Sequence, residues 1–280
     1  MENVALYIEH HIKHIATKHT SKLQDTPDFL RKLEQMKQEG KLPKNSILVV
    51  HDVSALFTNI PEKDGLQAME KSLNERTHPE ISTQFILRLL KLILKYNIFE
   101  FNKSLYKQLI GAAMGSRPIP PYADIFMAQQ IDPKFTTLAN KFGSLKFFKR
   151  YLDDLFSIFI GTTKTLHKFQ EELNQIHPTI KFTINHTSPE EEADEDHCDC
   201  EKKKSVSFLD TLCSIENRQI VTDLYRKPSD RNKYLLPDSC HGNSVKENIQ
   251  CSLFFWESQE FVQIFTPKKK FWRIKKHAFR

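Results

Sequence analysis

The sequence predicts an α+β domain with a mostly antiparallel sheet, on three observations. Short apolar runs rich in valine, isoleucine and phenylalanine alternate with stretches whose apolar residues recur at helical spacing. These strands and helices follow one another without a regular strand-helix-strand rhythm, which argues against a parallel sheet. With 39% hydrophobic and 11% aromatic residues among 280, the chain can bury the core of one large domain or two small ones.

The chain is expected to begin with helices that lead into a buried strand. Asp25, Thr26 and Pro27 form the pattern of a helix start with proline in the first turn, and Gly40 marks the end of that helix. The run SILVVHD, residues 46–52, is apolar and β-rich and ends in an acidic residue. It is therefore expected to be a buried strand whose last side chain reaches a sheet edge.

Helices and strands are expected in alternation further along the chain. Helical periodicity predicts helices, whereas continuous or alternating apolar runs predict strands. The predicted helices span residues 63–76, 81–96, 122–141 and 163–176. The predicted strands are a hairpin at 99–109 that turns near Asn102-Lys103, a strand-turn-strand at 146–160, and single strands at 180–186, 205–215 and 220–227.

Composition divides the chain into three segments. A helical segment, 1–45, precedes a central domain, 46–235, which carries a charged low-complexity insert at 188–204. The last segment, 236–280, ends in TPKKKFWRIKKHAFR, residues 266–280, with seven Lys or Arg and no acid. Since the whole chain has a net charge of +6, the rest is close to neutral. The tail suits a phosphate backbone, an anionic membrane or a nuclear import receptor; a solvated terminal helix is the other interpretation.

Several classes of protein are excluded by composition. No apolar run approaches the roughly 20 residues that span a bilayer, and the charged N-terminus is unlike a signal peptide, so an intracellular protein without a membrane partner is expected. The five cysteines are odd in number and lack a repeated spacing, which favours reduced thiols in the cytoplasm or nucleus. His197, Cys198 and Cys200 form a weak zinc pattern, because Cys240-His241 is the only partner pair.

Two adjacent acids interrupt the apolar stretch KFFKRYLDDLFSIFI, residues 146–160. Asp153 and Asp154 fall in the expected turn, and two charges at ~4 Å repel by ~4 kcal/mol at an effective dielectric near 20. A divalent cation removes that penalty, and hard carboxylate oxygens select Mg²⁺ or Mn²⁺. Asp52, at the end of its own strand, is the candidate third ligand. The alternative is that the pair only makes a polar hairpin turn.

Five ordered blocks give the chain a family resemblance. They are HDVSALFTNIP (51–61), QLIGAAMGSRPIPPYADIFM (108–127), RYLDDLFSIF (150–159), FLDT (208–211) and TDLYRKPSDRNKYLLPDSCH (222–241). Together they resemble the reverse transcriptases of Penelope-like retroelements, from about residue 20 to residue 250. The resemblance implies a retrotransposon-encoded RNA-directed DNA polymerase, a nucleotidyltransferase that uses an RNA template, a DNA primer and deoxynucleoside triphosphates.

The resemblance also implies a fold and a catalytic triad. The fold is a right-hand polymerase palm, a small antiparallel sheet backed by helices, with incomplete fingers and thumb. Asp52, Asp153 and Asp154 match the family's metal-binding aspartates, which hold two Mg²⁺ (or Mn²⁺) ions. Residues 1–45 would be the remnant of the fingers and the approach to the palm, and 236–280 a degenerate thumb-side segment.

Four residues match positions that contact the nucleotide in the family. Phe57 falls where the family places an aromatic steric gate against ribonucleotides; core packing is the alternative. Gly115 and Ser116 belong to the block that touches template and incoming base, where a missing Cβ permits close approach of the backbone. Gln108 precedes this block as it does in the family.

Arg226 and Lys227 are expected to face nucleic acid or the triphosphate, or else to be two solvated charges, while Asp210 of FLDT is expected to be structural.

The chain departs from the family in lacking finger motifs before Asp52 and in carrying Arg117 where proline is typical. A second hypothesis follows, an inactive remnant that only binds nucleic acid. A third is an unrelated α+β interaction domain with a chance pair of aspartates.

Overall fold

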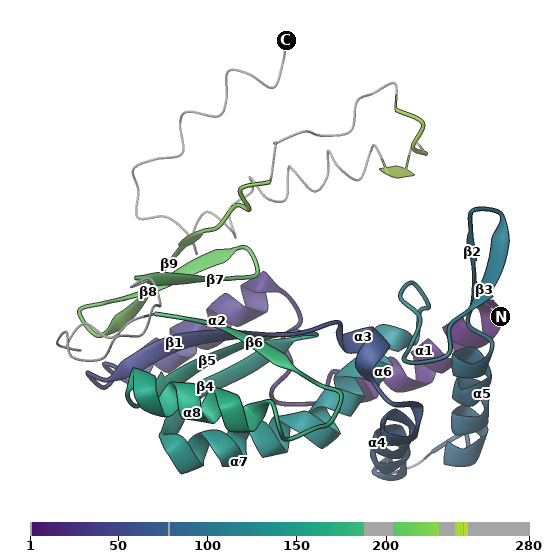
Figure 1. Cartoon of the computed structure of the whole chain (residues 1–280), viewed down its shortest axis with the longest axis horizontal. Coiled ribbons are helices and arrows are strands. Elements are labelled where there is room, and N and C mark those ends of the chain that lie inside the picture. Colours follow the sequence, from purple (N-terminus) through teal and green to yellow (C-terminus); the bar gives the residue numbers. More distant parts are fainter. Residues whose placement is uncertain (1, 78, 188–203, 230–238, 243, 246–280) are drawn as a thin grey trace.

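The computed structural model of the chain is shown in Figure 1, and it describes residues 2–77, 79–187, 204–229, 239–242 and 244–245. The expectations for the insert up to residue 203, for the zinc pattern at 197–200 and for the basic tail lie outside these residues. No helix in the described ranges is long and apolar enough to cross a membrane.

A four-stranded antiparallel sheet forms the centre of the fold. Its strands are β1 (Ser46–Val53), β4 (Ser144–Tyr151), β5 (Asp154–Ile160) and β6 (Phe182–His186), in the order β4-β5-β1-β6. Strand β1 pairs with β5 on one side and β6 on the other. The α+β class and the antiparallel sheet predicted from sequence are confirmed.

Helices surround this sheet and extend from one end of it. They are α1 (Glu2–Ala16), α2 (Thr26–Gln38), α3 (Leu56–Asn59), α4 (Glu62–Asn74), α5 (Thr83–Lys95), α6 (Ile119–Phe126), the π-helix η1 (Met127–Ile131), α7 (Asp132–Phe142) and α8 (Thr163–Leu173). Helix α2 begins as predicted, with the Asp25 carboxylate accepting from the amide of Asp28 at 2.7 Å. The helix predicted at 122–141 is interrupted by the π-helical turn.

The two faces of the central sheet bury different cores. Ile47 and Val49 of β1 point into a cluster with α7 and α8, whereas Leu48 points to the opposite side, toward α2. This alternation is the period of two expected of a strand. Figure 1 shows α7 and α8 below the sheet and α2 and the small sheet above it. The sheet is therefore held from both sides, which makes it a rigid support for groups at its ends.

A three-stranded antiparallel sheet covers the α2 side. Its strands are β7 (Ser205–Phe208), β8 (Thr211–Glu216) and β9 (Gln219–Leu224). The prediction of one strand over 205–215 was wrong, because the chain reverses at Leu209, whose φ is 50°. The Thr211 hydroxyl donates to the Phe208 carbonyl at 2.7 Å and closes this turn. The sequence did not indicate this turn, because Leu209 continues the apolar pattern of a strand.

The β2 (Ile98–Phe101) and β3 (Ser104–Lys107) hairpin projects from the helical end of the molecule (Figure 1). Asn102 and Lys103 both have positive φ, 49° and 60°, so the predicted turn is confirmed. The hairpin leaves large apolar side chains exposed, among them Phe101 at 68% and Leu105 at 75%.

Candidate active site

The three candidate aspartates lie at one end of the β1–β5 pair. In the strand register Asp52 is directly opposite Asp154. The amide of Val53, next to Asp52, donates to the carbonyl of Asp153 at 3.0 Å. Side chains directly opposite in an antiparallel pair have Cβ atoms roughly 4.5–5.5 Å apart. Residues about a hundred positions apart in the sequence therefore meet at one sheet edge.

A two-residue turn carries Asp153. Strand β4 ends at Tyr151 and pairs there with Asp154, the first residue of β5, so Leu152 and Asp153 make the whole connection. Leu152 has a φ of 52°, in the left-handed region. The tight turn sets two consecutive carboxylates at the rim of the sheet.

The electrostatics of this rim are unfavourable to negative charge. Burial raises the pKa of Asp154 to about 6, with the charges of Asp153 and Asp52 adding to the effect and Lys227 opposing it. Burial and the charge of Asp153 also raise the pKa of Asp52. The carboxylates carry more mutual repulsion than the nearby lysine offsets, so a bound cation would stabilise this end of the sheet.

The donor set fits a hard divalent cation. Carboxylate oxygens are the ligands that Mg²⁺ and Mn²⁺ prefer, and the three acids at this rim offer nothing softer. Across the part of the chain that the structure describes, no three His, Cys, Asp or Glu side chains already converge as a set of metal ligands. The backbone register thus brings the aspartate positions together, and their side chains do not form a closed cage.

A cavity of about 590 Å³ opens beside Asp154. It lies between the start of α2, the β4–β5 turn, the β7–β8 turn and the segment that follows β9, and Lys227, Asp25 and Asp210 line it. Asp210 accepts a hydrogen bond from the Thr26 hydroxyl at 3.0 Å, which ties the β7–β8 turn to α2. Asp210 therefore has a structural contact of the kind expected from the sequence.

Phe57 lies beside the loop that follows the hairpin. Its side chain is half-buried and packs against the main core, and its carbonyl accepts from the amide of Ala112 at 2.7 Å. Gly111, with a φ of 76°, approaches α3 so closely that an added Cβ would come 2.4 Å from the Thr58 carbonyl oxygen. The glycine is required by this contact, which holds the loop against Phe57.

The other three candidate nucleotide-binding residues, Gln108, Gly115 and Ser116, differ in their contacts. The Gln108 side chain donates to the Ile110 carbonyl at 2.8 Å and accepts from the side-chain amide of Asn97 at 2.7 Å. These two hydrogen bonds hold the loop in place. Gly115 is exposed, with a φ of 96° and no atom within 4 Å of an added Cβ. Ser116 is half-buried, and its carbonyl accepts from the amide of Ile119 at the start of α6.

Arg226 and Lys227 follow the last strand of the small sheet, and both are exposed. Lys227 faces the cavity beside Asp154, and its charge acts on that carboxylate. The structure thus brings Lys227 to Asp154 from more than 70 positions away in the sequence.

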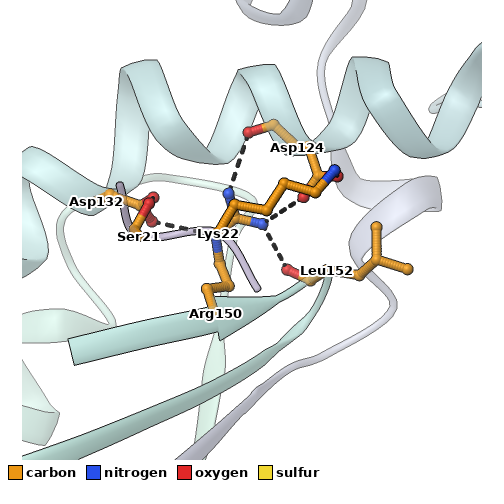
Figure 2. Close-up of polar contacts among 6 residues, drawn as sticks. All are labelled: Ser21, Lys22, Asp124, Asp132, Arg150 and Leu152. Carbon is orange, nitrogen blue, oxygen red and sulfur yellow. Dashed lines mark hydrogen bonds and ion pairs between the residues drawn. The ribbon is translucent and has the colours of Figure 1, made fainter. Parts of the chain in front are cut away.

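A buried ion-pair network beside the β4–β5 turn had not been expected from the sequence (Figure 2). Arg150 of β4, fully buried, donates from Nη1 to the Asp124 carboxylate at 2.8 Å and from Nε to the Asp132 carboxylate at 3.3 Å. Lys22 pairs with Asp124 as well. The available signal was an aspartate inside an apolar helix, whereas Arg150 follows Lys149 in its strand and does not stand out.

His51 lies next to Asp52 and points to the opposite face of the sheet. It is fully buried among Phe135, Phe169 and Phe182, with ring centroids 5.3–6.4 Å away. Burial lowers the pKa of His51 to about 3. The imidazole is therefore neutral at physiological pH and serves the core under the site.

Several solved polymerases have a similar fold. Telomerase from Candida tropicalis in complex with a TWJ fragment of telomeric RNA aligns with a TM-score of 0.55 and 12% identity, over 91% of this chain and 41% of that chain. Telomerase from Candida albicans in complex with a TWJ fragment of telomeric RNA aligns at 0.52 with 11% identity, over 78% and 38%. The BmCPV RNA-dependent RNA polymerase at elongation state aligns at 0.51 with 11% identity, over 75% and 19%.

These likenesses define a class of fold, a reverse-transcriptase-like polymerase palm. The chain spans between 38% and 44% of the length of the telomerase chains it matches. No family model matches the sequence. No curated protein matches it either.

Proposed function

We propose that the chain is the reverse transcriptase domain, an RNA-directed DNA polymerase, of a Penelope-like retrotransposon. The observation that carries the proposal is the register of Asp52 opposite Asp154, with Asp153 in the adjoining turn, in a palm-type polymerase fold. The five sequence blocks that resemble the family include all three aspartates. This combination supports nucleotidyl transfer over a chance pair of acids.

In this proposal the three carboxylates bind two divalent ions at the rim of the sheet. When bound, such ions activate an attacking hydroxyl and stabilise a leaving pyrophosphate. The primer 3′-oxygen forms a bond to the α-phosphorus of the deoxynucleotide, the bond to pyrophosphate breaks, and the hydroxyl proton passes to solvent. Asp52, Asp153 and Asp154 would hold the ions, whose positive charge would offset the burial and the mutual repulsion that together raise the pKa of Asp154.

The remaining site residues act in binding. The ring of Phe57 would lie under the sugar and exclude a 2′-hydroxyl, and Gly115 and Ser116 would face the template and incoming base. Gln108 supports that role indirectly, because its amide braces the loop. Lys227 would contact nucleic acid or the triphosphate at the cavity of about 590 Å³, and Arg226, next to it in the chain, would face the same ligand.

Primer extension tests the proposal. The chain should add deoxynucleotides to a DNA primer on an RNA template with Mg²⁺ or Mn²⁺, and Asp153→Asn should abolish extension. Asp223→Asn, an exposed acid on β9, is the matched control and should extend normally. Extension that survives Asp153→Asn refutes the mechanism. Salt-sensitive binding of the primed template without incorporation would instead identify an inactive remnant.

A further inference from the structure

The turn that carries Asp153 is held in an uncommon conformation. Leu152 has a φ of 52°, a region that a leucine occupies only where the surroundings hold it there. The carbonyl of Leu152 accepts a hydrogen bond from Nη1 of Arg150 at 2.9 Å. The guanidinium therefore fixes the orientation of the peptide between Leu152 and Asp153. That peptide leads directly to the first of the two paired carboxylates.

Arg150 reaches the turn from the face opposite the carboxylates. In the register of the β4–β5 pair Arg150 faces Leu155, a buried residue of the helical core, whereas Tyr151 faces Asp154. The guanidinium lies with Asp124 and Asp132 between the sheet and the helices that carry these aspartates (Figure 2). Its Nη2 also donates to the Asp124 carbonyl at 3.1 Å. Arg150 is thus anchored in α6 and α7 while it holds the turn.

The π-helix explains how two carboxylates face one guanidinium. Asp124 and Asp132 are eight positions apart, and in a regular α-helix residues at that spacing point about 80° apart. The π-helical turn of η1, Met127–Ile131, accommodates one more residue than an α-helical turn. The two aspartates are then related as residues seven apart, about 20° from alignment. Both carboxylates reach the same side of the helix because of this insertion.

The network is balanced in charge and closed by a neighbouring segment. Lys22 pairs with Asp124, and the Ser21 hydroxyl donates to Asp132 at 2.5 Å. The Arg150 amide donates to the Ser21 carbonyl at 2.7 Å, so this segment runs beside β4. Two cations face two anions with their hydrogen bonds made, the condition under which buried charges persist. Apolar residues of similar size would serve stability as well, so the arrangement favours a role in positioning.

We propose that Arg150 is a positioning residue, which sets the orientation of the Asp153-Asp154 turn for divalent-cation binding. This inference rests on the proposed function for its metal-binding consequence. The line of contact runs from Asp124 through Arg150 to the Leu152 carbonyl, and from the Asp153 carbonyl to the Val53 amide beside Asp52. Lysine cannot replace Arg150, because its single ammonium lacks the planar fork that reaches two carboxylates and a carbonyl together.

Hydrogen exchange and Mn²⁺ binding test the inference in the full chain. In Arg150→Lys, exchange of the Val53 amide should accelerate at least about tenfold. The Ser54 amide, which donates to the Lys181 carbonyl at 2.9 Å on the other side of β1, should be unchanged. The dissociation constant for Mn²⁺, measured by calorimetry, should rise at least about tenfold.

A matched control separates positioning from stability. Leu90→Ala removes a fully buried side chain from α5, a helix that packs mainly against α1 and α4 and contributes no residue to the Arg150 network. It should lower the melting temperature without changing Val53 exchange relative to Ser54 or Mn²⁺ affinity. If Arg150→Lys does not fold by circular dichroism, Asp132→Asn weakens the hold on Nε of the guanidinium by removing the negative charge with the shape kept, and both readouts should move in the same direction.

The outcomes are distinct. Exchange and Mn²⁺ affinity at wild-type values in Arg150→Lys, with binding lost in Asp153→Asn, overturn the inference and leave the proposed function intact. Equal changes in Arg150→Lys and Leu90→Ala also overturn it. Undiminished Mn²⁺ binding by Asp153→Asn refutes the proposed metal site, and Val53 exchange then decides alone whether Arg150 holds the turn.

Discussion

Asp154 should destabilise the protein when no divalent cation is present. Its carboxyl pKa is raised from 3.8 to about 6, first by burial and then by Asp153 and Asp52. A group whose pKa is higher in the folded state favours folding below its unfolded pKa and loses that contribution as the pH rises through its folded pKa. The loss should therefore develop between about pH 4 and pH 6 and be complete at pH 8.

The size of the effect follows from these values. The interval from 3.8 to about 6 corresponds to about 3 kcal/mol as an upper limit. Asp154 is only half-buried, so solvent screening reduces the figure to roughly 1–2 kcal/mol. Asp154→Asn removes the charge and keeps the shape, and for a chain of this size the melting temperature should rise by roughly 3–6 °C at pH 8.

Thermal unfolding in EDTA at pH 4 and pH 8 measures the difference in melting temperature between Asp154→Asn and wild type. The advantage of Asp154→Asn over wild type should be small at pH 4 and full at pH 8. Glu216→Gln, an exposed acid at the end of β8, serves as the control and should shift neither value. Mn²⁺ should stabilise wild type and not Asp154→Asn. A variant equal to or less stable than wild type at pH 8 would refute the electrostatic reasoning.

Two further predictions concern the supports of the site. Burial lowers the pKa of His51 to about 3, so the folded protein keeps this imidazole neutral while the unfolded chain binds a proton below pH 6.5. The free energy of unfolding should therefore fall as the pH drops from 6.5, by about 2 kcal/mol at pH 5. His51→Leu should flatten this decline in acid titrations followed by circular dichroism, and a slope equal to that of wild type would contradict the assignment. Gly111→Ala should destabilise by roughly 1–3 kcal/mol in urea unfolding, because its Cβ would meet Thr58. Gly115→Ala, which meets no atom within 4 Å, should cost less, and a reversed order would show that the contact with α3 is unimportant.

Local patterns predicted most of the elements around the site. The continuous apolar run in 46–52 identified β1, because both faces of that strand are buried against different cores. The turn at Asn102-Lys103 was predicted because asparagine tolerates positive φ. Leu209 and Leu152 also have positive φ, and their side chains give no such sign. The split of 205–215 was missed for this reason.

The buried charges show a second limit of local reasoning. Asp124 is a single charge in an apolar stretch, whereas Arg150 follows Lys149 and Asp132 has polar residues close by, so none of the three shows its partner in the sequence. Their pairing depends on the π-helical insertion in η1 and on the segment at Ser21, which runs beside β4. Neither the π-helical insertion nor the contact between the Ser21 segment and β4 produces a periodic pattern of residues in the sequence.

The amino-acid sequence alone determined the class of fold, the strand that carries Asp52 and the adjacent acids at 153 and 154, because hydrophobic periodicity and residue chemistry are local properties. Only the tertiary structure decided that Asp52 lies opposite Asp154, that Lys227 faces the same carboxylate, and that Arg150 braces the turn from below. Strand register and the pairing of buried charges are settled by packing between segments distant in the chain, where burial makes each misplacement costly.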